Sequence, residues 1–186
     1  MRAGGGRAVL LLALALSGCR SRSADVPSAA EDAGAPIPSA NTTLPGCEVL
    51  MPADLRELTL PGFTLQEERM CPTCGPLCTF RSAREKDVSV SVAWDCNPRY
   101  AQADVHTLME PSLRAGGEQV PALGRAAVRR APAQGMVQVM TWDDDTPCAL
   151  VVTSLGGETE RALDVARTAL TSTTPAALVP PPPATP

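Results

Sequence analysis

The clearest pattern in the chain is a strict alternation of apolar and polar residues between Val88 and Cys96. Because successive side chains of a strand point to opposite faces, this alternation predicts a β-strand with one buried face. The inward set ends with Trp94 and Cys96, and the outward set consists of small or polar side chains, namely Ser89, Ser91, Ala93 and Asp95.

Shorter apolar runs predict further strands on both sides of this one. Two lie before it, at 64–70 and 78–82, and we expect them to pair in antiparallel fashion. Three lie after it, at 126–130, 136–142 and 148–154. The last two are separated only by residues 143–147, Asp-Asp-Asp-Thr-Pro, so they predict a hairpin.

Helical spacing of apolar residues occurs in three segments. The first is 52–58, where Pro52 suits the first turn and Leu55 and Leu58 share a face with Met51. The second is 101–112, which Pro111 should kink or stop early. The third begins near Glu158 or Thr159 and carries an apolar stripe of Ala162, Leu163, Val165, Ala166, Ala169 and Leu170.

Together these elements predict an α+β fold over residues 46–173. We expect an antiparallel sheet of five to six strands with two to three helices packed on it. A domain of this length is long enough to bury about two-thirds of its unfolded surface. The flanking segment 19–45 is rich in Ala, Ser and Pro, the tail 174–186 is rich in Pro, and both are expected to be disordered.

The N-terminus has the order of features found in export signals. A basic start with Arg2 and Arg7 precedes the apolar run 8–16, which is too short to span a bilayer. The following Leu16-Ser17-Gly18-Cys19 resembles the lipobox of bacterial lipoproteins, in which the cysteine is lipidated and becomes the first mature residue. The resemblance implies a signal peptide at 1–18, a lipid anchor on Cys19 and a disordered tether.

Location and charge follow from this interpretation. The resemblance implies the outer membrane of a Gram-negative cell, or otherwise the outer face of the plasma membrane. Loss of residues 1–18 removes Arg2 and Arg7 and leaves 14 basic against 20 acidic side chains, a formal charge of −6. Aromatic residues are only 3% of the chain and no basic run exists, which argues against nucleic-acid binding.

Six cysteines remain after Cys19, and an even number in an exported domain predicts three disulfides. Fifteen pairings are possible. A Cys96–Cys148 bridge would close a loop of some fifty residues and stabilise the domain by about 4 kcal/mol. The candidate disulfide cysteines are Cys47, Cys71, Cys74, Cys78, Cys96 and Cys148.

Two alternatives to purely structural disulfides remain open. Cys71 and Cys74 have the spacing of a redox pair, with Cys71 as nucleophile and Cys74 as resolving thiol, although Gly75-Pro76 is a poor start for the helix that lowers a thiol pKa. The same two cysteines with Cys78 are also spaced for a zinc site, with Cys47, Cys96 or His106 as the fourth ligand. We expect no metal, no cofactor and a surface position for His106.

Other catalytic patterns are absent from the sequence. Asp143, Asp144 and Asp145 lack the spacing of a calcium loop, so we expect a solvated acidic turn. No serine lies in a G-x-S-x-G motif, and the glycine pairs belong to no nucleotide-binding motif. Trp94 and Trp142 are expected to pack in the core or on the sheet.

A second resemblance covers most of the domain. The segments that carry it, 47–52, 78–80, 123–127 and 162–170, look like those of small cysteine-paired lipoproteins of unknown function from high-GC bacteria. A similar layout occurs in extracellular sensor domains of some mycobacterial serine/threonine kinases. The resemblance implies no catalytic residues, and Cys71 and Cys74 depart from its pattern.

These observations predict a membrane-anchored lipoprotein with a non-enzymatic binding or scaffolding domain in the cell envelope. Its partners would be the membrane, through Cys19, and an envelope protein. The alternatives are an envelope thiol-disulfide oxidoreductase that uses Cys71 and Cys74, and an extracytoplasmic sensor or accessory subunit.

Overall fold

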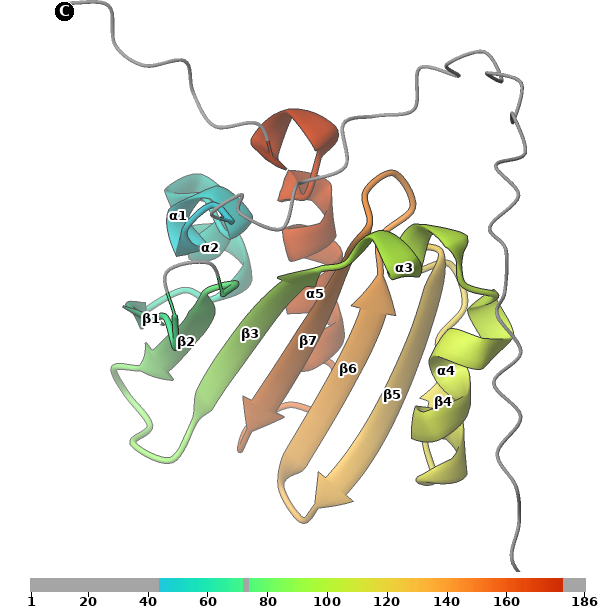
Figure 1. Ribbon diagram of the computed structural model, residues 1–186. Coiled ribbons are helices and arrows are strands. Elements are labelled where there is room, and N and C mark those ends of the chain that lie inside the picture. The colour runs from blue at the N-terminus through green and yellow to red at the C-terminus, as the bar shows by residue number, and fades with distance from the viewer. Residues whose placement is uncertain (1–43, 72–73, 179–186) are drawn as a thin grey trace, which may run out of the picture. The chain divides into compact units, whose positions relative to one another are not determined.

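A seven-stranded antiparallel sheet is the centre of the computed structural model, which describes residues 44–71 and 74–178 (Figure 1). The strand order is β1-β2-β3-β7-β6-β5-β4. The described residues belong to one compact unit of the chain. No helix among them is long and apolar enough to cross a membrane.

The sheet consists of two meanders that meet at β3 and β7. The first contains β1 (Phe63–Glu68), β2 (Leu77–Ser82) and β3 (Ser89–Cys96). The second contains β4 (Glu118–Gln119), β5 (Ala126–Ala133), β6 (Met136–Trp142) and β7 (Cys148–Leu155). Strands β3 and β7 pair over their full lengths, from Ser89 opposite Leu155 to Cys96 opposite Cys148.

Within the described residues, five α-helices and one 3₁₀ helix accompany the sheet. They are α1 (Cys47–Leu50), α2 (Ala53–Thr59), α3 (Pro98–Gln102), α4 (Val105–Arg114), α5 (Arg161–Ser172) and the 3₁₀ helix η1 (Pro175–Leu178). The predicted α+β class with disulfides is therefore confirmed, and so is the hairpin of β6 and β7.

The predicted element counts are wrong. The sheet has seven strands rather than five to six, because β4 has only two residues and shows no alternation that a sequence can reveal. The domain has five α-helices rather than two to three, because α1 and α3 are too short for helical spacing to be recognised. The predicted helix at 101–112 is in fact α3 followed by α4, and α4 continues through Pro111 to Arg114.

Side-chain capping explains the division into α3 and α4. Asn97 accepts a hydrogen bond from the backbone N–H of Arg99 at 3.0 Å, and Pro98 occupies the first turn of α3. Asp104 accepts one from the N–H of Thr107 at 3.1 Å and begins α4. Each capping side chain satisfies a donor that a helix start leaves unpaired, so the sequence starts a helix twice within seven residues.

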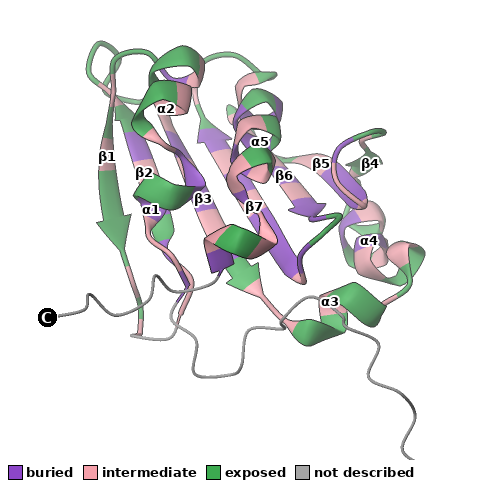
Figure 2. Cartoon of the chain, turned by 90° about the horizontal axis from the view of Figure 1, so that it is seen from above, coloured by how far each residue is buried: buried purple, intermediate pink, exposed green. Residues whose placement is uncertain are grey.

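Helices α1 and α5 cover one face of the sheet. Buried side chains of α5, such as Val165 and Ala166, pack with Phe80, Val92 and Leu150 from the strands. Figure 2 shows the buried central strands in contrast to the exposed edge strand β1. The apolar stripe predicted for the C-terminal helix is thus confirmed.

The domain extends slightly beyond the predicted bounds of 46 and 173. Leu44 and Leu178 are buried and belong to the same core cluster. Single leucines in Pro- and Ala-rich surroundings do not change local composition, so composition placed them in the flanking segments. By contrast, Leu58 of α2, predicted to share a face with Met51, is 80% exposed, whereas Met51 is fully buried.

Candidate functional site

The six cysteines in the described residues form three disulfides. Cys47–Cys78 joins α1 to β2, and Cys96–Cys148 joins the register partners that end the β3–β7 ladder. Cys71–Cys74 closes a short ring in the loop between β1 and β2. The structure thus brings together the predicted cysteines in one of the fifteen pairings that the sequence left open.

The three disulfides differ in what they contribute to stability. Cys47–Cys78 and Cys96–Cys148 span 31 and 52 residues, whereas Cys71–Cys74 spans 3. In the chain-entropy account the two long loops are worth about 4 kcal/mol each and the short one about 2 kcal/mol. The two long-loop disulfides are therefore expected to contribute most to stability, and Cys71–Cys74 is expected to contribute least.

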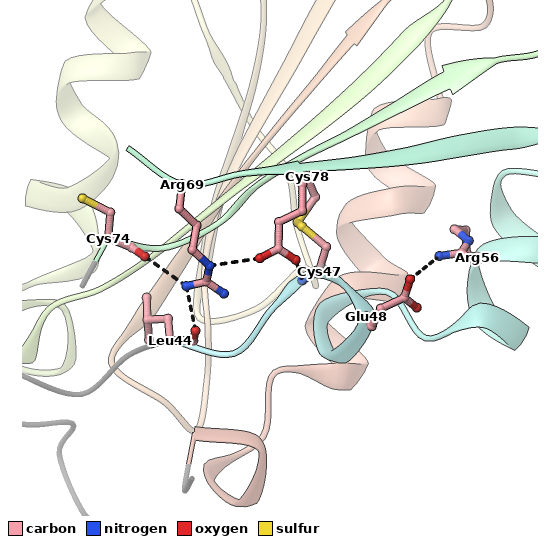
Figure 3. Close-up of a disulfide and its surroundings, with 8 residues drawn as sticks. Leu44, Cys47, Glu48, Arg56, Arg69, Cys74 and Cys78 are labelled. Atoms are coloured by element: carbon pink, nitrogen blue, oxygen red, sulfur yellow. Dashed lines mark hydrogen bonds and ion pairs between the residues drawn. A yellow bond between two sulfur atoms is a disulfide. The ribbon is translucent and has the colours of Figure 1, made fainter. Parts of the chain in front are cut away.

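The Cys71–Cys74 loop is held by Arg69 (Figure 3). The Arg69 guanidinium donates to the carbonyl oxygens of Leu44 at 2.9 Å and Cys74 at 3.3 Å, and it pairs with the Glu67 carboxylate at 2.9 Å. The other Glu67 oxygen accepts the backbone N–H of Cys47 at 2.7 Å. One guanidinium and one carboxylate thus tie the loop to the start of α1.

The loop also packs closely on β3. A side chain at Gly75 would place its Cβ 1.5 Å from the carbonyl oxygen of Trp94, so only glycine fits. The next residue, Pro76, accepts a hydrogen bond from the Trp94 N–H at 3.4 Å. Gly75 and Pro76, which argue against a helix after Cys74, therefore pack the loop against the neighbouring strand β3.

The structure separates the proposed zinc ligands. Cys78 is bonded to Cys47, and Cys71 is bonded to Cys74, so the three sulfurs do not form one ligand set. No group of three or more potential metal ligands occurs among the described residues. His106 lies exposed on α4, as predicted.

The acidic turn is only partly solvated. Asp144 and Asp145 are exposed, but Asp143 is 8% exposed and accepts hydrogen bonds from the Thr146 hydroxyl and from the backbone N–H of Asp144. Burial raises the pKa of Asp143 to about 7, and Asp145 acts in the same direction, whereas the two donors lower it. A cavity of about 470 Å³ lies between this turn and the end of α5.

The other face of the sheet carries a continuous row of polar side chains. The strand register places six residues side by side across β1, β2, β3, β7, β6 and β5: Gln66, Thr79, Ser91, Thr153, Gln138 and Arg130. Arg130 donates to Gln138 at 2.7 Å, and Gln138 donates to Thr153 at 3.1 Å. With strands about 4.8 Å apart, the row is about 24 Å long.

An apolar row runs beside the polar one. It consists of Leu77, Ala93, Val151, Met140 and Val128, in register across β2, β3, β7, β6 and β5. Helix α4 covers its β5 end, where Met109 packs with Val128 and Trp142. Among residues 44–71 and 74–178, no helix packs on this face over β1 and β2 (Figure 1). Helix α3 reaches it only at the end of β3, where the Tyr100 hydroxyl donates to the Asp95 carboxylate at 2.8 Å. We call the polar row together with the uncovered apolar residues Leu77, Ala93 and Val151 the open face.

The tryptophans take no part in the open face. Trp94 and Trp142 are both buried, Trp94 in the main core cluster and Trp142 in the cluster with Met109 of α4, which confirms the expectation that they pack in the core or on the sheet. Sequence analysis missed the open face because alternation marks which residues share a face within one strand but not which residues meet across strands. The sequence indicated only that Ser89, Ser91 and Ala93 lie on the outward face of one strand.

Comparison with known protein families, characterised proteins and solved structures finds no match to this chain. Cys19, the predicted signal peptide and most of the predicted tether and tail lie outside the described residues. The candidate functional features of the described part are therefore the open face and the Cys71–Cys74 loop.

Proposed function

We propose that this protein is a lipoprotein of the cell envelope, anchored through Cys19, and that the open face of its domain binds an envelope protein in a non-enzymatic role. The lipobox-like residues 16–19 support the anchor. Three disulfides support an oxidising compartment, since such bonds persist outside the cytoplasm. The observation that carries the binding role is the open face.

The open face has the chemistry of a non-obligate protein interface. Such interfaces combine apolar contact with hydrogen bonding and few charges at their centre. At the centre here are Thr79, Ser91 and Thr153, which donate and accept hydrogen bonds, beside Ala93 and Val151, which offer apolar contact. The charged side chain of the polar row, Arg130, lies at its β5 end and is already bonded to Gln138.

The anchor is tested by following a clickable fatty acid in the producing bacterium. We expect the wild-type chain to incorporate the fatty acid and to sediment with membranes, and Cys19→Ser to do neither. The Cys71→Ser/Cys74→Ser variant, which removes two other cysteines, is the matched control and should remain labelled. Equal labelling of Cys19→Ser and wild type would refute the anchor.

Binding is tested by a photo-crosslinking residue placed at Ser91 or Thr153 in living cells. We expect one discrete adduct from both positions and none from Thr171, an exposed threonine of α5 on the other side of the sheet. A Ser91→Lys substitution should abolish the adduct formed from Thr153, while Thr171→Lys should not. A membrane-spanning partner would indicate a sensor or accessory subunit, and no adduct from either position would contradict the binding role.

A further inference from the structure

We propose that the Cys71–Cys74 disulfide is redox-active and exchanges with cysteine pairs of other proteins, while Cys47–Cys78 and Cys96–Cys148 stay closed. This activity is independent of the open face and of the anchor. It gives the Cys71–Cys74 disulfide a chemical role and the two long-loop disulfides a structural one.

Accessibility separates the pairs. Cys47 and Cys78 are fully buried, so no bulky thiolate reaches their disulfide without local unfolding. In Cys96–Cys148 only Cys96 is partly exposed, whereas Cys148 is 1% exposed. Cys71 and Cys74 are both partly exposed. The preceding Met70 is 96% exposed, so the approach to the loop is open on that side. Exchange requires in-line attack on a sulfur, and access therefore decides which pair reacts.

The loop has supports that do not depend on its disulfide. Arg69 holds the carbonyl of Cys74, Gly75 is seated against the Trp94 carbonyl, and Pro76 is bonded to the Trp94 N–H. Reduction breaks none of these contacts. Cys74 therefore keeps its position after the S–S bond opens, and the pair can close again without refolding.

The proposed exchange proceeds through a mixed disulfide between the loop and the substrate protein. A thiolate of the substrate protein attacks Cys71 or Cys74 and forms a mixed disulfide, and the other loop sulfur leaves as a thiolate and takes up a proton. The second substrate thiol, once deprotonated, attacks the mixed disulfide and releases an oxidised substrate and a reduced loop. Two electrons pass from the substrate to the loop. The reverse exchange with another protein disulfide reoxidises the pair.

The pair lacks the feature that activates thioredoxin-like motifs. The element that directly follows Cys74 is the strand β2 and not a helix, so no helix N-terminus at Cys74 stabilises a thiolate. We therefore expect exchange with accessible cysteine pairs of unfolded or extended protein segments, at rates set mainly by the attacking thiol.

Selective reduction is the first test. The full chain, exported and purified in its oxidised state, is equilibrated with glutathione buffers of decreasing potential, quenched with acid, alkylated and mapped by peptide mass. We expect Cys71 and Cys74 to be labelled under conditions that leave the other four cysteines unlabelled. Opening of all three pairs together, or of the loop pair last, would overturn the proposal.

Exchange is the second test, with a reduced synthetic peptide that contains two cysteines as the probe. We expect the wild-type chain to oxidise one peptide per molecule, and the Cys71→Ser/Cys74→Ser variant to lose at least 90% of this activity with its fold intact. With the oxidised peptide, a single Cys71→Ser or Cys74→Ser variant should form a stable mixed disulfide. Peptide oxidation by the double variant at the wild-type level would refute the assignment.

The two proposals can fail separately. The peptide assay needs neither Cys19 nor the open face, and the Thr171→Lys variant should leave both the crosslink and the exchange unchanged. Exchange without a crosslinked partner would contradict the binding role and support the redox role, and the opposite result would do the reverse.

Discussion

Asp143 carries the largest resolved pKa change among the carboxyl groups of the described residues, and its cause is position. Its backbone N–H bonds to the carbonyl of Cys148 at 2.9 Å, which draws the residue into the mouth of the β6–β7 hairpin. Water reaches Asp144 and Asp145 but hardly reaches Asp143. The three consecutive aspartates therefore differ in exposure, because only Asp143 is turned inward.

We expect the raised pKa to make stability depend on pH. Unfolded Asp143 ionises near pH 3.8 and folded Asp143 near pH 7, so the folded state holds an extra proton between these values. The contribution of Asp143 to the free energy of unfolding should therefore be most favourable below pH 4. It should fall as the pH rises to 7, by at most about 1.4 kcal/mol per pH unit.

Urea unfolding of the variants between pH 4 and 8 measures this dependence. The Asp143→Asn variant should lose this part of it, because the amide does not ionise. Asp144→Asn, the exposed neighbour, should keep the wild-type slope. Parallel curves for wild type and Asp143→Asn would show that the carboxyl group ionises normally in the fold.

At the scale of elements, the two meanders are joined by one strand pair. Strands β3 and β7 are adjacent in space although more than fifty residues separate Cys96 from Cys148. The ladder between them has eight register pairs and ends in the disulfide. Helix α5 packs on β7 and β6, so it reinforces the C-terminal side of this junction.

The disulfides should therefore differ in their effect on stability. Replacing Cys96 and Cys148 by alanine should lower the free energy of unfolding by about 4 kcal/mol, whereas replacing Cys71 and Cys74 should lower it by about 2 kcal/mol or less. Urea midpoints of the two double variants, measured at equal ionic strength, give the comparison. Equal losses would mean that loop length does not govern these contributions.

Strands were easier to predict than helices in this chain. The alternation at 88–96 and the short turn after Trp142 are local signals, and they placed β3, β6 and β7 within about a residue. The short α1 is fixed by contacts that are distant in sequence, including the bond of Cys47 to Cys78 and the Glu67 carboxylate at its first N–H. No window of sequence around 47–50 contains that information.

The candidate sites also combine local features, which the sequence shows, with contacts between distant residues, which it does not. The cysteines were visible in the sequence, but their pairing depends on how strands align, and Arg69 became relevant only when the fold brought it to Cys74 and Leu44. The open face likewise needs the register of six strands before Gln66 and Arg130 belong to one row.

For the whole molecule, the described chain begins and ends in the same core. Leu44 packs near Gly75, and Leu178 closes η1, and both are buried in the cluster that contains Trp94. Short apolar contacts at both ends thus complete the core from outside the strands and main helices.

Truncation of the Leu178 side chain should therefore be costly. We expect Leu178→Ala to lower the free energy of unfolding by about 2–3 kcal/mol, within the usual range for buried leucines. Ala176→Ser, an exposed change in the same 3₁₀ helix, should have an effect below about 0.5 kcal/mol. Thermal and urea unfolding of both variants provide the check, and a neutral Leu178→Ala would show that the core ends at α5.

The two long disulfides also determine how the domain responds to tension. Force applied to the chain before Leu44 is transmitted through the Cys47–Cys78 disulfide to β2. The edge strand β1 lies between these two cysteines in sequence, so it bears no load. A pull that reaches β3 passes through Cys96–Cys148 into β7 and bypasses the residues between them. The bonded segments span 31 and 52 residues, and at about 3.4 Å per residue they remove about 280 Å from the stretched length. The oxidised domain therefore extends less under load than the fully reduced one.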